Sequence, residues 1–117
     1  MQVQISTDHN IEGREALAER FSGMVESALD RFGDRITRVE VRLSDENGQK
    51  HGAEDKRCMI EAHLEGHQPL AVTHHAAALD QAVDGAAHKL VRLIEHTLGR
   101  QRDQNSHAAS RAQPEPS

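Results

Sequence analysis

The apolar residues of this chain recur at two different spacings, and each spacing predicts one kind of element. Spacings of three and four residues predict two amphipathic helices, one over about 11–32 and one that starts between residues 76 and 79 and runs to about 97. The apolar stripe of the first is Leu17, Phe21, Met24, Ala28 and Phe32, and that of the second is Leu79, Val83, Ala86, Leu90, Leu93, Ile94 and Leu98. Gly33 follows the first helix, where a residue with left-handed backbone would end it.

Alternation of apolar and polar residues predicts four short strands, over about 2–7, 36–43, 58–64 and 70–74. Their inward-facing residues are Val3 and Ile5, then Val39, Val41 and Leu43, then Cys58, Ile60, Ala62 and Leu64, and finally Leu70 and Val72. Residues 8–10 carry side chains that cap a helix N-terminus. The polar stretch 45–55, with its glycines, predicts a long hairpin loop.

The element order is therefore β-α-β-β-β-α, which predicts an α+β domain. We expect a four-stranded sheet with both helices on one face, because each helix has one apolar side that needs the same aliphatic sheet surface. The first two strands are parallel if they are adjacent, and hairpins make the remaining pairs antiparallel. The opposite face of the sheet stays solvated and carries Arg38, Glu40, Arg42, Arg57, Glu61 and His63.

The length of 117 residues suits one domain, which we place at residues 1–102. Residues 103–117 continue no apolar stripe and are predicted to be a disordered tail. The chain has one cysteine, no apolar run of about 20 residues and no basic segment followed by an apolar one at its start. These features predict a cytoplasmic protein without a membrane span.

The chain is acidic overall, with a net charge of −5 when the histidines are neutral. Cations that gather in one place are therefore the main candidate for a functional surface. The cations on the polar side of the second helix are Lys89, Arg92, Arg100 and Arg102, and Arg38 and Arg42 form a second patch on the solvated sheet face. Ammonium and guanidinium groups bind phosphate oxygens without regard to sequence, so RNA is the expected ligand. Two alternatives stay open: Lys89 and Arg92 could pair with Asp84 or Glu95, and Glu40 and Glu61 could neutralise the sheet patch.

Catalytic and metal chemistry have little support in the sequence. Cys58 lies at an inward strand position, where a thiol is unreactive. No phosphate-binding glycine loop or Gly-x-Ser-x-Gly motif is present. The nine histidines show no local spacing that encodes a four-ligand metal site, although they would make the surface more positive in mild acid. We therefore expect a non-enzyme without cofactor or metal.

Three segments resemble ribosome hibernation factors, the short hibernation promoting factor and ribosome-associated inhibitor proteins of bacteria. They are the opening Met-Gln-Val-Gln-Ile, the Ile-x-x-Val-x-Val-x-Leu strand at 36–43, and the helix whose Asp-x-x-x-x-Lys-Leu-x-Arg stretch spans 84–92. The resemblance covers roughly residues 1–100 and implies a β-α-β-β-β-α fold, similar to a double-stranded-RNA-binding domain with an extra strand. It also implies binding to the rRNA of the small ribosomal subunit, in the channel for mRNA and tRNA, which stops translation under stress. Lys89 matches the family's lysine and Arg92 its arginine.

The acidic first helix leaves a second function open. It carries Glu12, Glu15, Glu19, Glu26 and Asp30 against three arginines, whereas typical family members are basic. The alternative is a protein-interaction module on the same fold, whose acidic surface binds a basic regulatory or ribosomal protein.

Overall fold

The elements follow one another in the order that the sequence predicts. The structure is a computed structural model that describes residues 1–8, 14–45 and 56–110, and for residue 14 and residues 100–110 it describes the backbone alone. The elements are β1 (Gln2–Thr7), α1 (Arg14–Leu29), the short 3₁₀ helix η1 (Asp30–Phe32), β2 (Ile36–Asp45), β3 (Lys56–Leu64), β4 (Leu70–Ala76) and α2 (Leu79–Ser110).

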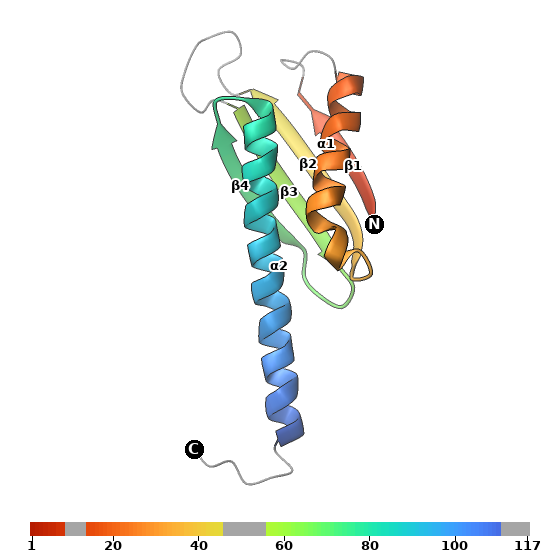
Figure 1. Cartoon of the computed structure of the whole chain (residues 1–117), viewed down its shortest axis with the longest axis vertical. Coiled ribbons are helices and arrows are strands. Elements are labelled where there is room, and N and C mark those ends of the chain that lie inside the picture. The colour runs from red at the N-terminus through yellow and green to blue at the C-terminus, as the bar shows by residue number, and fades with distance from the viewer. Residues whose placement is uncertain (9–13, 46–55, 111–117) are drawn as a thin grey trace.

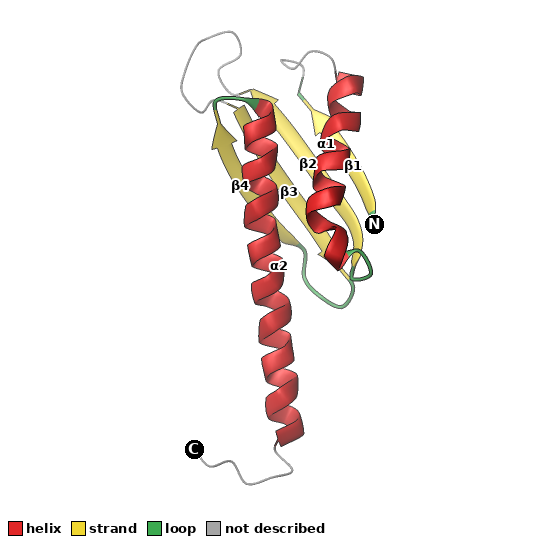
Figure 2. Ribbon diagram, viewed as in Figure 1, coloured by secondary structure: helices red, strands yellow, loops and turns green. Residues whose placement is uncertain are grey.

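The four strands form one sheet in the order β1-β2-β3-β4, with β1 parallel to β2 and the other pairs antiparallel. Parallel neighbours cannot be joined by a tight turn, so the chain crosses from β1 to β2 through α1. The register pairs Val3 with Val39 and Val41 with Ile60, which collects the apolar side chains on one face. Both helices cover that face (Figures 1 and 2). The predicted α+β fold is confirmed, while the likeness to a double-stranded-RNA-binding domain stays a prediction.

The core is aliphatic and lies between the sheet and the two helices. Its largest fully buried side chains are Phe21, Val25, Leu29, Val39, Val41, Leu43, Cys58, Ile60, Val83, Leu90 and Ile94. The predicted stripe of the first helix missed Val25 and Leu29, which are both 0% exposed. Met24 and Ala28, which the stripe did include, are half-buried against α2. The helix therefore packs against two partners, and a single narrow stripe cannot describe a side that touches both the sheet and a second helix.

The end of the first helix differs from the prediction at Gly33. This glycine has right-handed backbone angles, φ −54° and ψ −37°, and its N–H donates to the oxygen of Asp30 at 3.0 Å. The chain leaves α1 by tightening into η1, so no left-handed residue is needed there. Among the described glycines, the positive φ belongs instead to Gly66, at 80° in the turn between β3 and β4.

Three strands are longer than predicted, and β3 begins at Lys56 rather than at Cys58. β2 runs through Asp45, which is 8% exposed and accepts a hydrogen bond from Lys56 Nζ at 3.1 Å. The N–H of Asp45 also donates to Asp8 Oδ2 at 3.3 Å. β4 continues through Ala76 rather than ending near His74. The predicted loop at 46–55 and the predicted capping residues 9 and 10 lie outside the described residues.

Helix α2 is much longer than predicted. It ends at Ser110 rather than near Thr97, and its second half extends beyond the sheet (Figure 1). Residues 103–110 of the expected disordered tail are therefore helical, and residues 111–117 lie outside the described part of the chain. Within that part, no helix combines the length and the apolar content needed to cross a membrane. The domain boundary at 102 stays a prediction.

Deleting residues 103–117 is expected to leave thermal unfolding almost unchanged. The segment adds Ala108, Ala109 and Ala112 but no larger apolar side chain, so it has little surface to bury. Calorimetry of the truncated and full chains tests this. A decrease of more than about 4 °C in the midpoint, roughly 1 kcal/mol for a domain of this size, would show that the tail stabilises the fold.

β4 and α2 approach each other closely at Gly85. The ring of His74 lies directly against the Cα of this glycine, where an added methyl group would meet Cγ, Cδ2 and Nε2 of the ring. His75, the next residue on β4, is exposed on the opposite face. The absent side chain of Gly85 therefore allows the helix to pack closely along the edge strand.

Candidate nucleic-acid interface

The charged residues of α2 are sorted onto two sides of the helix. At about 100° per residue, Lys89, Arg92 and His96 fall on one side, and Asp80, Asp84 and Glu95 fall on the other. Contacts identify the two sides. Lys89 Nζ donates to the backbone oxygen of Thr73 on β4, at 3.0 Å, and Glu95 Oε2 lies 2.8 Å from Arg31 Nη2 beside α1. Lys89 therefore lies at the edge of the sheet, Arg92 lies next to it on the solvent side of the helix, and the acids lie on the side toward α1.

Each of these three acids has a partner other than the helix's own cations. Asp80 Oδ2 lies 3.8 Å from Arg20 Nη2 of α1, and Glu95 is paired with Arg31 of η1. His88 Nδ1 donates to the backbone oxygen of Asp84 at 2.9 Å and lies 3.5 Å from its carboxylate. Pairing of Lys89 and Arg92 with Asp84 or Glu95, which the sequence left open, is therefore not what the structure shows.

Lys89 and Arg92, the described cations on this side of the helix, remain available to a ligand. An ammonium group has three donors, and the bond to Thr73 occupies one donor of Lys89. This bond also covers a carbonyl on the open edge of β4, which is a common protection for edge strands. Arg92 is exposed and forms no ion pair or hydrogen bond with other residues in the described part of the chain.

The remaining two cations of the predicted row lie on the projecting half of α2. Position 100 follows Lys89 by eleven residues, about three turns, and so lies on the same side of the helix. Position 102 is rotated by about 220° from Lys89 and falls on a different side. The structure describes only the backbone at Arg100 and Arg102, so their roles stay predictions.

Arg38 and Arg42 lie on the outer face of the sheet, as predicted, and thus on the opposite side of the sheet layer from α2. Their cross-strand partners on β3 are His63 and Met59. Arg57 is paired with Ser44, which lies two residues beyond Arg42 on β2, so Arg57 is a diagonal neighbour of Arg42. The sequence-predicted cations therefore form two separate patches, one beside the β4 edge and one on the outer sheet face.

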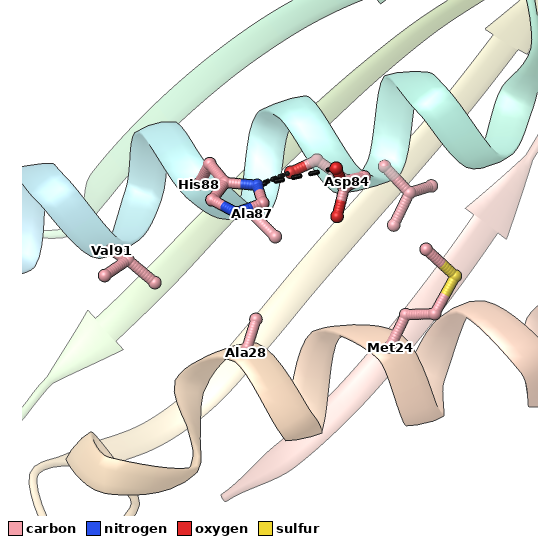
Figure 3. A pocket seen from close by; sticks show the side chains of 7 residues that line it. Met24, Ala28, Asp84, Ala87, His88 and Val91 are labelled. Carbon is pink, nitrogen blue, oxygen red and sulfur yellow. Dashed lines mark hydrogen bonds and ion pairs between the residues drawn. The ribbon is translucent and has the colours of Figure 1, made fainter.

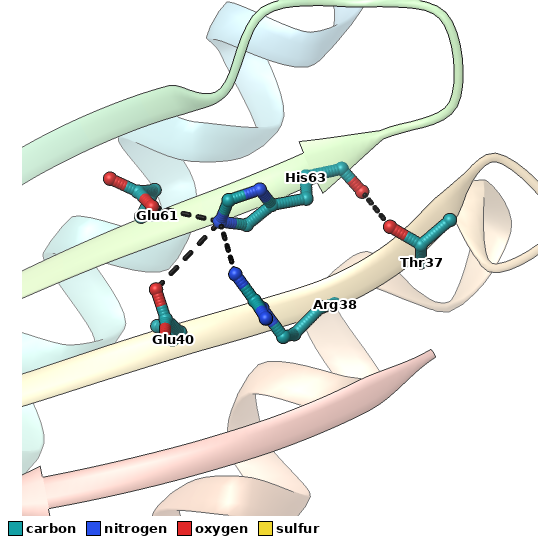
Figure 4. Close-up of polar contacts among 5 residues, drawn as sticks. All are labelled: Thr37, Arg38, Glu40, Glu61 and His63. Carbon is teal, nitrogen blue, oxygen red and sulfur yellow. Dashed lines mark hydrogen bonds and ion pairs between the residues drawn. The ribbon is translucent and has the colours of Figure 1, made fainter.

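The acids of the outer face do not neutralise the arginines as simple cross-strand pairs. Glu40 and Glu61 face each other directly in the β2–β3 register, which places two like charges side by side. Both approach one histidine nitrogen: Nε2 of His63 lies 2.8 Å from Glu61 Oε1 and 3.7 Å from Glu40 Oε2 (Figure 4). Arg38 Nη2 reaches the same nitrogen at 3.4 Å.

Sequence reasoning did not find this cluster, which we call the outer-face triad: Glu40, Glu61 and His63. Its sequence signal is Glu-x-His at 61–63, because residues two apart on a strand share a face. Glu40 is 21 residues away from Glu61 in the chain, and only the strand register brings it there. The β2–β3 pairing shifts register between Ile36 and Arg38, and Glu40 meets Glu61 in the register that follows this shift.

Groups for catalysis are not gathered in the described part of the chain. Burial raises the pKa of the Cys58 thiol to about 12 although Arg57 acts in the opposite direction, so the thiol stays protonated and unreactive. An apolar pocket of about 240 Å³ lies between α1 and α2 (Figure 3). Its lining is Met24, Ala28, Val83, Asp84, Ala87, His88 and Val91. The Asp84–His88 pair at this pocket has no serine, threonine, cysteine or lysine beside it in the lining.

Two solved structures show the same fold. The N-terminal domain of Thermus thermophilus Protein Y is 24% identical, with a TM-score of 0.64 over 83% of this chain and 99% of that domain. A ribosomal subunit interface protein from Coxiella burnetii is 16% identical, with a TM-score of 0.62 over 84% of this chain and 99% of that protein. No curated protein is similar enough in sequence to count as a relative.

A family model decides the relationship, because it matches most of the sequence. The model describes Sigma 54 modulation protein / S30EA ribosomal protein and matches residues 3–102. Apart from residue 2, this range contains all six strands and helices that the sequence predicts, and it confirms the resemblance to ribosome hibernation factors. The chain belongs to the Sigma 54 modulation protein / S30EA ribosomal protein family.

Proposed function

We propose that this protein is a ribosome-associated translation inhibitor that binds rRNA of the small subunit in the channel for mRNA and tRNA. Lys89 and Arg92 contact phosphates from the side of α2 that faces away from α1, Arg100 extends this contact along the helix, and Arg102 adds a cation on another side of the projecting half. Arg38 and Arg42 on the outer sheet face supply a second patch. The protein acts in the cytoplasm, by steric blocking and without catalysis. Membership in a ribosomal protein family supports the choice of partner.

The observation that supports this proposal best is the separation of charge on α2. The acids of α2 whose side chains are described, Asp80, Asp84 and Glu95, lie beside Arg20, His88 and Arg31, so they do not neutralise the cations on the other side. A phosphate backbone approaching the β4 edge meets Lys89 and Arg92 without acids of the same helix between them. A chain of net charge −5 can therefore still present a local cationic surface.

The acidic remainder of the protein affects the strength of binding. Glu15 and Glu19 are exposed on α1, in the same helical layer as α2. Their charges repel a polyanion at long range, and salt screens this repulsion over about 8 Å at physiological ionic strength. We therefore propose binding that is weaker than that of a basic relative.

Replacing Lys89 and Arg92 together with glutamine is expected to weaken association with small subunits by at least about tenfold. Two phosphate contacts are lost, so the slope of log K against log salt concentration should also become shallower by about one unit per contact. The matched control is Ser27→Glu with Gln68→Glu, which changes net charge by the same −2 at exposed positions outside the patch. Cosedimentation with purified small subunits over a salt series measures both quantities. Equal weakening in both variants would mean that only net charge matters.

Neutralising acids on α1 separates the RNA proposal from the alternative of a protein-interaction module. Glu15→Gln with Glu19→Gln should strengthen small-subunit binding if RNA is the ligand, because two repelling charges are removed. It should weaken binding if a basic ribosomal protein recognises the acidic surface. The same cosedimentation assay measures the sign, and weaker binding would exclude the proposal.

A further inference from the structure

We propose that the outer-face triad of Glu40, Glu61 and His63 binds a divalent transition metal ion of the Zn²⁺ class. Each residue offers one ligand atom, and the three atoms lie within 4.8 Å of one another. Imidazole nitrogen and carboxylate oxygen are donors that zinc prefers in proteins. This inference concerns a site on the sheet and does not depend on the proposed binding to RNA.

Two of the three separations in the triad are close to those around a tetrahedral ion, and all three atoms lie within 4.8 Å of one another. Donors at about 2.0–2.2 Å from zinc are about 3.4 Å apart in a tetrahedron. The two separations from His63 Nε2, 2.8 Å to Glu61 Oε1 and 3.7 Å to Glu40 Oε2, lie on either side of this value. Small rotations of two partly exposed glutamates therefore complete the geometry. The triad lies on an open sheet face, and each of its side chains is partly exposed, by about one third or less. Water therefore reaches the site and supplies the fourth ligand.

Several polar groups converge on one nitrogen of His63. Nε2 is approached by two carboxylates and by the guanidinium of Arg38. A protonated nitrogen donates to Glu61 but repels the N–H of Arg38, and a deprotonated one accepts from Arg38 but repels both carboxylates. One nitrogen cannot satisfy these neighbours together. A metal ion can, because it takes the lone pair and both carboxylates while the exposed Arg38 side chain turns away.

The strand register supplies a second, independent reason. Glu40 and Glu61 are directly opposite each other, and like charges in that position destabilise a sheet. Their outer neighbours in the same row are Gln4 on β1 and Ala71 on β4, neither of which brings a positive charge. Arg38 and Arg42 flank Glu40 on β2, so they balance the two carboxylates overall, but neither lies between them. A divalent ion bound between the carboxylates would remove their repulsion directly.

Zinc titration of the tag-free protein, without ribosomes, tests the proposal. His63→Gln and Glu61→Gln are each expected to lower zinc affinity by at least about tenfold, as measured by competition with a chromophoric chelator. The matched controls are His75→Gln, on the same sheet face, and Glu65→Gln, in the turn after β3; both should bind as the unchanged protein does. Mg²⁺, which prefers six oxygen ligands, should bind far more weakly.

The position of the ion is measured on the unchanged protein, so the test holds even if a variant fails to fold. Zinc should shift the amide resonances of Glu40, Glu61 and His63 and raise the midpoint of thermal unfolding with increasing concentration. Shifts confined to other histidines would overturn the proposal. So would equal affinity in His63→Gln and His75→Gln, or the absence of any shift.

Discussion

Leu90→Ala is expected to lower the free energy of unfolding by about 2–4 kcal/mol, the range for a large-to-small change in a core. Leu90 is 0% exposed and lies on the side of α2 that meets the sheet. The substitution removes apolar surface from a site surrounded by the helix and the strands on both sides, so the cavity cannot collapse easily. Chemical denaturation followed by circular dichroism measures the loss.

Gln81→Ala is the control for Leu90→Ala. Gln81 is exposed on the same helix, and its backbone N–H, which alanine keeps, donates a hydrogen bond to Asp80 Oδ1 at 3.0 Å. Alanine is also a slightly better helix former, so this variant should change stability by no more than about 0.5 kcal/mol. Similar losses at the two positions would contradict the packing of α2 described above.

Gly85→Ala is expected to destabilise the protein by about 1–3 kcal/mol, which reverses the usual sign of this substitution in a helix. Alanine normally stabilises a helix interior by up to about 1 kcal/mol relative to glycine. Here the new methyl group overlaps the ring of His74, so the ring must leave its site or the helix must move off β4. Thermal and chemical unfolding measure the effect.

A double-mutant cycle shows whether the ring causes the loss. His74→Ala removes the overlapping atoms, so the variant with both His74→Ala and Gly85→Ala should be more stable than the sum of the two single changes predicts. Gly23→Ala is the control, because a methyl group there meets nothing within 4 Å. An increase in stability from Gly85→Ala alone would mean that His74 swings into solvent at little cost.

Residue periodicity was a good guide to this fold wherever one element faced one partner. The alternating residues of β2 and β3 predicted the buried face correctly, since Val39, Val41, Cys58 and Ile60 are all 0% exposed. The stripe of the first helix was less accurate. α1 contacts both the sheet and α2. The periodicity of one segment carries no information about where a second helix packs against it.

Helix ends were predicted poorly for a related reason. Gly33 suggested a left-handed end, but a 3₁₀ turn satisfies the same backbone groups at right-handed angles. Past Leu98, α2 continues through polar sequence to Ser110, because favourable helix propensity needs no buried stripe once a packed segment has nucleated the helix. An apolar stripe therefore marked where α2 packs rather than where it ends.

The sequence by itself determined the element order, the α+β fold, the family and the presence of cations on one side of the second helix. Each of these follows from local spacing or from a continuous segment of chain. Only the tertiary structure decided which charges neutralise one another, because Arg20 and Arg31 find their acidic partners on another element. It also decided that Glu40 meets Glu61 and His63, because strand register joins residues that are far apart in the chain. Local pattern thus fixes elements and faces, whereas the pairing of charges depends on how those elements pack.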